Sequence, residues 1–439
     1  MRGLGRAIFG IIAATLLLSC AGCGEEKIIS EDFERGNYGN FFVNPIMKTD
    51  KGFYYGQGAF KELSLHYYDS KNGKNMFLCN KPECRHDGNE FCAATSDKYR
   101  TMGAVMYGDS IYINVLEETE TSYVYKLLRA SLDGASLSEV VTYFEIDNVD
   151  IHPILYGDMS RAMAIHRNKA FLPYRLTNDV NSEVGICGTA IYDMDTGEVT
   201  YLGDKAFAGW DNNFMGCGEY MYFVTSQKYK TELYRYCYTD GSVEKVALER
   251  NFKGKYAIYD DNTIFYVRGQ GDLFIRKLDT KENIAVKTDE WNGYMLEIPE
   301  EKGGGIAMHT HARIESILSD GEYVYIPENF SLDSYSYPLY IIYYDSEATG
   351  ERVEITKDYI EVTILDSEGN YVNEVRVSSK DLLGYNEYFT LHFTEDAVYM
   401  QTSVMVYECS KADFIAGNAN FKEAYPLDID IVSRKEKAQ

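Results

Sequence analysis

The sequence predicts an all-β fold, a β-propeller of four-stranded antiparallel blades, and three observations lead to it. The first is composition: 39 Tyr and 21 Phe among 439 residues favour strands, where aromatic side chains fit a half-buried pleated surface. The second is a phrase of sequence that recurs seven times, and the third is a turn with Asp and Gly that follows most of its copies. With 45% hydrophobic residues and only 8 Pro, the chain is neither disordered nor a Pro-rich linker.

The recurring phrase is a polar turn with Asp, Gly or Asn, followed by a strand of alternating aromatic or aliphatic residues. Its equivalent anchors are Tyr54, Tyr112, Phe171, Tyr222, Phe265, Tyr325 and Tyr399. The anchors are 58, 59, 51, 43, 60 and 74 residues apart, which is the length of a propeller blade with variable loops. We therefore expect seven blades. Six or eight are the alternatives, because the intervals of 60 and 74 residues contain insertions.

The second phrase predicts another hairpin in each blade. It joins two strands through a turn with Asp and Gly, residues that tolerate the left-handed backbone of tight turns. Its copies lie at residues 66–73, 131–134, 191–197, 238–241 and 364–369. Two hairpins per period make a four-stranded unit, and such units arranged in a circle form a propeller. A β-sandwich would share the alternation, but seven registered copies favour the propeller. At most one helical turn is expected, at residues 379–383.

Residues 1–19 are predicted to be a lipoprotein signal peptide. A basic start precedes an apolar run at residues 7–18, which is shorter than the ~20 residues of a membrane-spanning helix. The string at residues 17–20 resembles the bacterial lipobox, and this resemblance implies a diacylglyceryl group on Cys20. Cys23 is a competing site with a poorer match. An uncleaved anchor or an ordinary secretory signal is the alternative.

The remaining chain is predicted to be one domain on a short tether. Residues 20–38 are polar and charged and indicate a lipidated tether, and residues 39–439 form a single propeller domain with a Cys/His-rich loop at residues 79–92. The protein is then extracytoplasmic and contacts the cell membrane only through its lipid. The net charge of -25 at pH 7 excludes nucleic acid as a partner, because phosphates would be repelled.

The repeated phrase at residues 108–112, its hairpin partner and the lipobox together resemble a bacterial family. They are similar to exported lipoproteins that carry a TolB-like or "domain of unknown function 5050" propeller. The resemblance covers nearly all of residues 20–439, through degenerate repeats. It implies a surface-displayed propeller with no established general activity.

One segment carries a specific chemistry. Its four potential metal ligands are Cys79, Cys84, His86 and Cys92. The pattern C-x4-C-x-H-x5-C suits a tetrahedral structural zinc, and Pro82 and Gly88 permit the turns that such a shell requires. A disulfide or free thiols are the alternatives, since export allows oxidation. A full shell of four protein ligands leaves no position for a substrate, so the expected role is structural.

Other His and Cys residues give weaker signals. His309 and His311 would share one face of a strand and could bind a metal with Glu315, although an exposed or hydrogen-bonded pair is the favoured interpretation. His166 and His392 precede their anchors and are expected to be core or channel residues with satisfied hydrogen bonds. Four single cysteines are expected to be small core residues: Cys187, Cys217, Cys237 and Cys409.

The sequence contains no serine-hydrolase elbow, zinc-protease motif, phosphate-binding loop or EF-hand. The leading hypothesis is a surface-anchored binding or interaction module for an extracellular glycan, peptide or envelope protein, because propellers present loops around a central channel. The alternative is a hydrolase or lyase acting on glycan or peptide, with carboxylates of perturbed pKa at the channel mouth. The segment at residues 327–379 departs most from the repeat. Its Tyr- and Ser-rich run at 331–340 resembles a recognition loop, although a strand pair is preferred.

Overall fold

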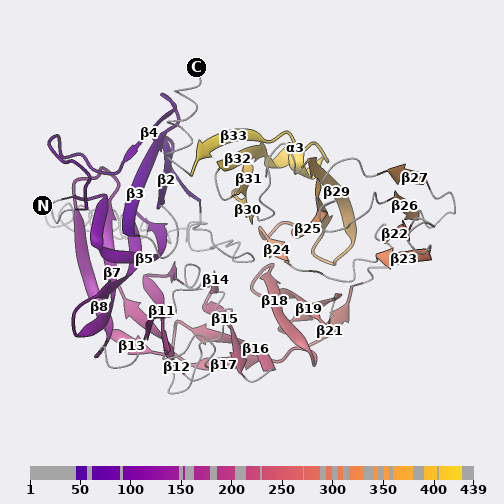
Figure 1. Cartoon of the computed structure of the whole chain (residues 1–439). Helices are drawn as coiled ribbons and strands as arrows, with labels where there is room; N and C mark the ends of the chain where they lie inside the picture. Colours follow the sequence, from indigo (N-terminus) through magenta and orange to yellow (C-terminus); the bar gives the residue numbers. More distant parts are fainter. Residues whose placement is uncertain are drawn as a thin grey trace, which may run out of the picture.

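The computed structural model shows an all-β chain whose four-stranded antiparallel sheets are arranged as a propeller (Figure 1), which confirms the predicted fold class. It describes residues 46–56, 62–88, 92–147, 152–153, 163–177, 185–202, 214–227, 230–269, 271–286, 293–298, 305–309, 314, 316–330, 340–344, 351–354, 359–378, 390–402 and 405–427. The predicted signal peptide, Cys20, Cys23 and the tether lie outside these residues. None of the described helices has the length and apolarity needed to cross a membrane.

The described strands of the first half form four units in chain order. The first unit contains β1 (Met47–Lys48), β2 (Gly52–Gly56), β3 (Glu62–Asp69) and β4 (Lys74–Phe77). The second contains β5 (Thr95–Tyr107), β6 (Ser110–Glu118), β7 (Ser122–Ser131) and β8 (Leu137–Asp147). The third contains β10 (Ala164–His166), β11 (Lys169–Thr177), β12 (Gly185–Asp193) and β13 (Val199–Tyr201), with β9 (His152–Pro153) beside β11. The fourth contains β14 (Met215–Cys217), β15 (Tyr220–Gln227), β16 (Lys230–Cys237) and β17 (Val243–Val246).

Three further units follow in the second half. The fifth contains β18 (Phe252–Ile258), β19 (Thr263–Arg268), β20 (Asp272–Lys277) and β21 (Asn283–Ala285). The sixth contains β24 (Leu318–Ser319), β25 (Val324–Phe330), β28 (Tyr359–Leu365) and β29 (Tyr371–Ser378). The seventh contains β30 (Thr390–Phe393), β31 (Ala397–Gln401), β32 (Met405–Ser410) and β33 (Lys422–Pro426), with helix α3 (Lys411–Ile415) before β33.

The aromatic anchors occupy one structural position. Every predicted anchor lies in the second strand of its unit and pairs with the first strand, as Phe171 does with Ala164 and Tyr222 with Met215. Each anchor is at most 8% exposed, because the alternating side chains of a strand fill the space between neighbouring sheets. The repeated aromatic anchors in the sequence therefore mark the buried second strand of each unit.

The second phrase forms the turn between the third and fourth strands, as predicted. Its glycines have φ between +62° and +80°, a region that other residues rarely adopt: Gly73, Gly134, Gly197, Gly241 and Gly369. The turn at residues 191–197 shows the chemistry, because the Asp193 carboxylate accepts hydrogen bonds from the N–H groups of Asp195 and Thr196.

An additional sheet explains the two long anchor intervals. Its order is β23 (Gly305–His309), β22 (Gly293–Ile298), β26 (Tyr340–Tyr344) and β27 (Glu351–Glu354). The strands β22 and β23 fall within the 60-residue interval, and β26 and β27 within the 74-residue interval. Figure 1 shows this sheet outside the ring, beside the sixth unit. Of the run at 331–340, only Tyr340 is among the described residues, as the first residue of β26.

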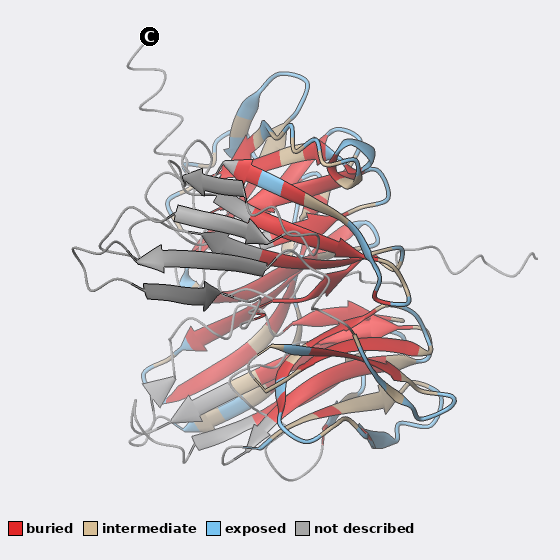
Figure 2. Cartoon of the chain, turned by 90° about the vertical axis from the view of Figure 1, so that its right-hand side faces the viewer, coloured by how far each residue is buried: buried red, intermediate tan, exposed pale blue. Residues whose placement is uncertain are grey.

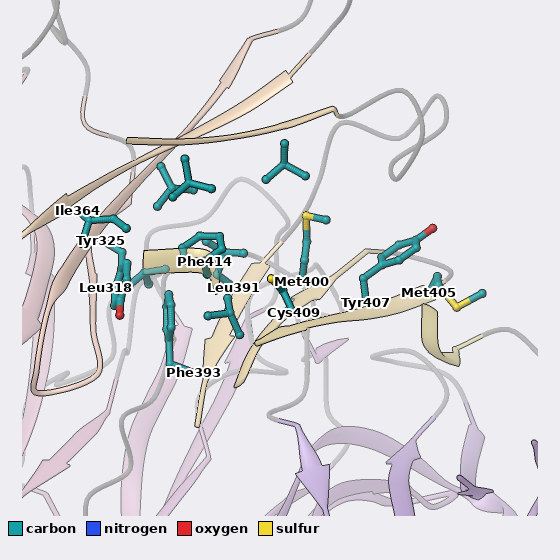
Figure 3. Close-up of a cluster of buried hydrophobic side chains, with 14 residues drawn as sticks. Leu318, Tyr325, Ile364, Leu391, Phe393, Met400, Met405, Tyr407, Cys409 and Phe414 are labelled. Carbon is teal, nitrogen blue, oxygen red and sulfur yellow. The ribbon is translucent and has the colours of Figure 1, made fainter. Parts of the chain in front are cut away.

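The core lies between neighbouring units, and Figure 2 shows buried residues running along the strands of the ring. Figure 3 shows the cluster shared by the sixth and seventh units. There the rings of Tyr325 and Phe393 stack with centroids 3.9 Å apart, and Phe414 of α3 is fully buried. Ser410 caps this short helix by accepting a hydrogen bond from the Asp413 N–H. The sequence did not predict α3, and the expected turn at residues 379–383 lies outside the described residues.

The first and seventh units meet at a contact that we call the closing seam. Its buried members are Phe53, Tyr55, Ala397, Tyr399, Val406 and Tyr425. Phe53 stacks on Tyr425 with ring centroids 4.5 Å apart. In the described part of the chain, no strand of the first unit pairs with a strand of the seventh, so side chains make this contact.

Candidate metal centre

The Cys/His-rich loop interrupts the outer edge of the first unit. Along β3, residues 66–69 pair with β4, whereas residues 62–64 pair with the start of β5. Leu65, between these two stretches, accepts a hydrogen bond from the Leu78 N–H and donates one to the Ala94 carbonyl. After β4, the chain therefore departs from the edge of β3 at Leu78, forms the Cys/His-rich loop, and returns to the same edge at Ala94. We call the contact between the first and second units, which includes this loop, the loop seam.

The excursion brings the four predicted ligands together. Their donor atoms all lie within 4.8 Å of one another: Cys79, Cys84, His86 and Cys92. Cys92 is buried, and the other three side chains are partly exposed. None of these three cysteines forms a disulfide bond within the described part of the chain. Ligand atoms around one tetrahedral zinc lie about 3.8 Å apart for sulfur, so a small contraction would give the required shell.

Local turns hold the loop in this shape. The Cys84 N–H donates to the Lys81 carbonyl at 3.1 Å, which closes a turn with Pro82 at its second position, where the fixed φ of proline is favoured. His86 has a φ of +54°, which costs energy for a residue with a Cβ. Gly88 has a φ of +83°, and a Cβ there would lie 1.9 Å from the Asp97 carboxylate. Pro82 and Gly88 therefore act as the sequence predicted.

Neighbouring side chains pack on the cluster. The His86 ring stacks on Phe77 of β4 with centroids 4.7 Å apart, and its Nδ1 lies 3.5 Å from the Cys92 sulfur. From the second unit, the Gly134 carbonyl accepts a hydrogen bond from the Asn80 N–H at 3.1 Å. A Cβ on Gly134 would lie 2.9 Å from the backbone N of Cys79, so glycine allows the turn between β7 and β8 to approach the loop.

The sulfur of Cys92 has an environment suited to a thiolate. Burial opposes its ionisation, but hydrogen bonds from Thr95, His86 and the Ala94 N–H lower the pKa of Cys92 to about 6. A hydrogen bond from the backbone N–H of His86 lowers the pKa of Cys84, but burial and the neighbouring thiols of Cys92 and Cys79 raise this pKa above its ordinary value. Thiolates bind soft and borderline metals, so this donor set fits zinc.

The sequence did not identify the supporting residues. Thr95 and Gly134 contact the cluster from β5 and from the turn after β7, and their roles follow from pairing of distant strands. His66 of β3 lies near His86, and burial together with His86 lowers the pKa of His66 to about 4. Its Nε2 is 2.7 Å from the Ser64 hydroxyl, so His66 belongs to the core beneath the loop.

The second histidine candidate is only partly described. His309 lies in β23, whereas His311 and Glu315 lie outside the described residues. His166 and His392 are buried core residues, and the His166 Nδ1 is 2.7 Å from the Tyr238 hydroxyl. Among the described atoms, the Nε2 of each histidine has no hydrogen-bond partner, so the expectation that both ring nitrogens are hydrogen-bonded is not met.

Two of the four single cysteines are core residues as predicted, since Cys217 and Cys409 are each 2% exposed. Cys237 is partly exposed, so its assignment to the core is wrong. The reason is its place at the end of β16, beside the outer turn at 238–241. The side chain of Cys187 lies outside the described residues.

No protein-family model matches this chain, and no curated protein matches it either. Solved structures with a similar backbone include a prolyl endopeptidase, with a TM-score of 0.47, 11% identity, and coverage of 94% of this chain and 54% of that one. This chain thus spans about half the length of that enzyme. BamB from Moraxella catarrhalis gives a TM-score of 0.36, 9% identity, and coverage of 82% and 93%. TolB from Acinetobacter baumannii gives 0.30, 11%, 75% and 78%.

Proposed function

We propose that this chain is an extracytoplasmic interaction module: a β-propeller held at the cell membrane by lipid on Cys20, with a structural zinc in its first unit. Its ligand is an extracellular glycan or peptide, or an envelope protein. The observation that supports a zinc site is the convergence of four potential donor atoms within 4.8 Å of one another in one loop. Zinc would cross-link the loop, and Cys79, Cys84, His86 and Cys92 would hold it.

A structural role fits the site better than a catalytic one. Three sulfurs and one imidazole complete a four-coordinate shell, and a catalytic zinc keeps one position for water or substrate. The site also lies at the edge of the first unit, between two strands that the loop connects. A metal there would fix the return of the chain to β3, which supports the packing of the first unit on the second.

The described carboxyl groups favour binding over the alternative, a hydrolase or lyase. Eleven described carboxyl groups have a lowered pKa, through ion pairs or turn hydrogen bonds. Burial opposes ionisation of Glu232, but Lys230, Lys245 and Tyr234 lower its pKa to about 2. A glycosidase acid needs a raised pKa. These carboxylates hold strands and turns together instead.

Elemental analysis with thiol counting tests the zinc. The purified full chain should contain one zinc per protein, and Cys84→Ser should lose it. Cys237→Ser is the matched control, because Cys237 is also partly exposed but lies outside the cluster. A metal-free protein with fewer free thiols than cysteines would show that the loop contains a disulfide and would overturn the proposal of a zinc site.

Anchoring and activity need separate tests. Metabolic labelling with a fatty-acid analogue should mark the wild type and Cys23→Ser but not Cys20→Ser; label on Cys20→Ser would refute lipidation at that residue.

Binding is distinguished from catalysis by incubating the chain with a panel of defined polysaccharides and peptides. Retention of one class without new reducing ends, unsaturated sugars or new amino termini supports an interaction module, whereas product formation supports the alternative.

A further inference from the structure

Thr95 supplies two of the four hydrogen-bond contacts to the Cys92 sulfur, and the His86 Nδ1 supplies another at 3.5 Å. Thr95 donates to Sγ twice, from its backbone N–H at 3.3 Å and from its hydroxyl at 3.1 Å. The Ala94 N–H donates the remaining hydrogen bond at 3.4 Å. Cys92 is 4% exposed and Thr95 8% exposed, so water does not compete effectively for these contacts.

The direction of the hydroxyl hydrogen bond follows from its second partner. The Gly88 N–H lies 3.2 Å from the Thr95 Oγ1, and a backbone N–H can only donate. The Thr95 oxygen therefore accepts from Gly88, and its own proton is directed to the Cys92 sulfur. One hydroxyl thus joins the turn after His86 to the last ligand of the loop.

We propose that Thr95 is a positioning residue of the metal centre, which orients the Cys92 thiolate and the Gly88 turn toward one ion. This inference rests on the proposed function. Cys92 is then the anchoring ligand, because its sulfur is held before the metal arrives, whereas Cys79 and Cys84 are partly exposed. Hydrogen bonds to a metal ligand from neighbouring residues fix its orientation and tune metal affinity.

The test compares Thr95→Val with Thr95→Ser and a matched control. Valine keeps the shape and the strand preference of threonine but removes the hydroxyl, and serine retains it. Thr101→Val is the control, because Thr101 lies in the same strand β5 and is 3% exposed, and its hydroxyl has no hydrogen-bond partner among the described atoms. Zinc affinity would be measured on the full chain by competition with a chromogenic chelator. We expect a loss of about 10- to 100-fold for Thr95→Val, and values near wild type for the other two.

Cobalt substitution gives a readout that general destabilisation would not change. A hydrogen bond to sulfur stabilises its lone pairs, so the thiolate-to-cobalt charge-transfer band should shift to lower energy in Thr95→Val only. Wild-type affinity and an unshifted band in Thr95→Val would overturn the role of Thr95 and leave the zinc site intact. A wild-type chain that binds neither zinc nor cobalt would overturn both proposals.

Discussion

The first unit meets its two neighbours across seams that are built differently. At the loop seam, β3 pairs directly with β5, and the Cys/His cluster closes the chain between them. At the closing seam, the described contacts are side-chain contacts such as the stack of Phe53 on Tyr425. The loop seam joins consecutive parts of the chain, whereas the closing seam joins parts that are far apart in sequence, so its closure costs more chain entropy.

This difference indicates where each kind of interaction is needed. Polar contacts also join other neighbouring units, and in the two examples that follow one partner lies in the turn after a first strand. Tyr107 donates to the Asn168 side chain at 2.9 Å, and the buried Lys411 ammonium lies 2.6 Å from Asp320. The loop would disrupt the edge of its unit if it were not held together. A cross-link is therefore expected at the loop seam, and large aromatic rings at the closing seam.

Phe53→Ala should have the largest effect, because it removes the central ring of the closing seam. Phe53 is 4% exposed, and truncation of a buried phenylalanine costs about 3–5 kcal/mol of unfolding free energy. Urea unfolding followed by tyrosine fluorescence would measure the loss. Tyr201→Ala is the control, since Tyr201 is 54% exposed and should lose less than about 1 kcal/mol. A loss below about 1 kcal/mol in Phe53→Ala would show that side chains do not hold this seam.

Metal removal should weaken the loop seam by a somewhat smaller amount. Free zinc at 100 to 1,000 times its Kd stabilises the bound form by about 3–4 kcal/mol, and a chelator removes this contribution. Hydrogen exchange should accelerate at the Leu65 and Leu78 amides, which tie the loop to β3, while amides of β31 remain unchanged. Cys84→Ser should be insensitive to chelator. Equal acceleration at both seams would contradict the assignment of the metal to one of them.

Acid should affect the closing seam through His392. Burial lowers the pKa of His392 to about 4, against 6.5 for the free side chain, and its register partner Tyr399 contacts Phe53. The unfolded chain binds more protons than the folded one between these values, so the contribution of the neutral imidazole is complete above pH 6.5. It is lost as pH falls from 6.5 toward 4.

The expected loss between pH 7 and pH 5 is about 1–2 kcal/mol. Urea unfolding of the wild type and of His392→Gln at both pH values would measure it, because glutamine does not titrate. The variant should show a smaller difference between the two pH values. An equal difference in both proteins would assign the acid sensitivity to other groups, such as His166, whose pKa burial also lowers to about 4.

The sequence predicted those features that depend on neighbouring residues. The anchors could be predicted because side chains along a strand are buried alternately, which gives a local sequence pattern. Tyr222 and Phe265 are two examples of this pattern, each in its own unit. The turn with Pro82 and the clustering of the four potential ligands could be predicted because one short segment contains them all. Spacing of ligand types is a local property, so the cluster could be recognised without a fold.

The remaining features depend on contacts between distant segments. The additional sheet combines β22 and β23 with β26 and β27, and neither insertion alone indicates its partner. Thr95 has no distinguishing mark in sequence, because its role arises only when β5 pairs with β3 and brings Gly88 near. The partial exposure of Cys237 follows from its position beside an outer turn, which a pattern of single cysteines does not report.

Lys48→Met should have the smallest effect, and it separates the polar rim of the closing seam from its aromatic core. The Lys48 ammonium lies 3.1 Å from Glu408 and also donates to the Tyr399 hydroxyl. The side chains of Lys48 and Glu408 are 35% and 38% exposed, so water and salt screen the pair. Exposed ion pairs contribute about 0–1 kcal/mol, and methionine retains the apolar stem. Unfolding in low and high salt should show a small loss that disappears at high salt. A loss similar to that of Phe53→Ala would instead show that this ion pair holds the closing seam together. The two seams would then differ because an ion pair stabilises one and a metal site the other.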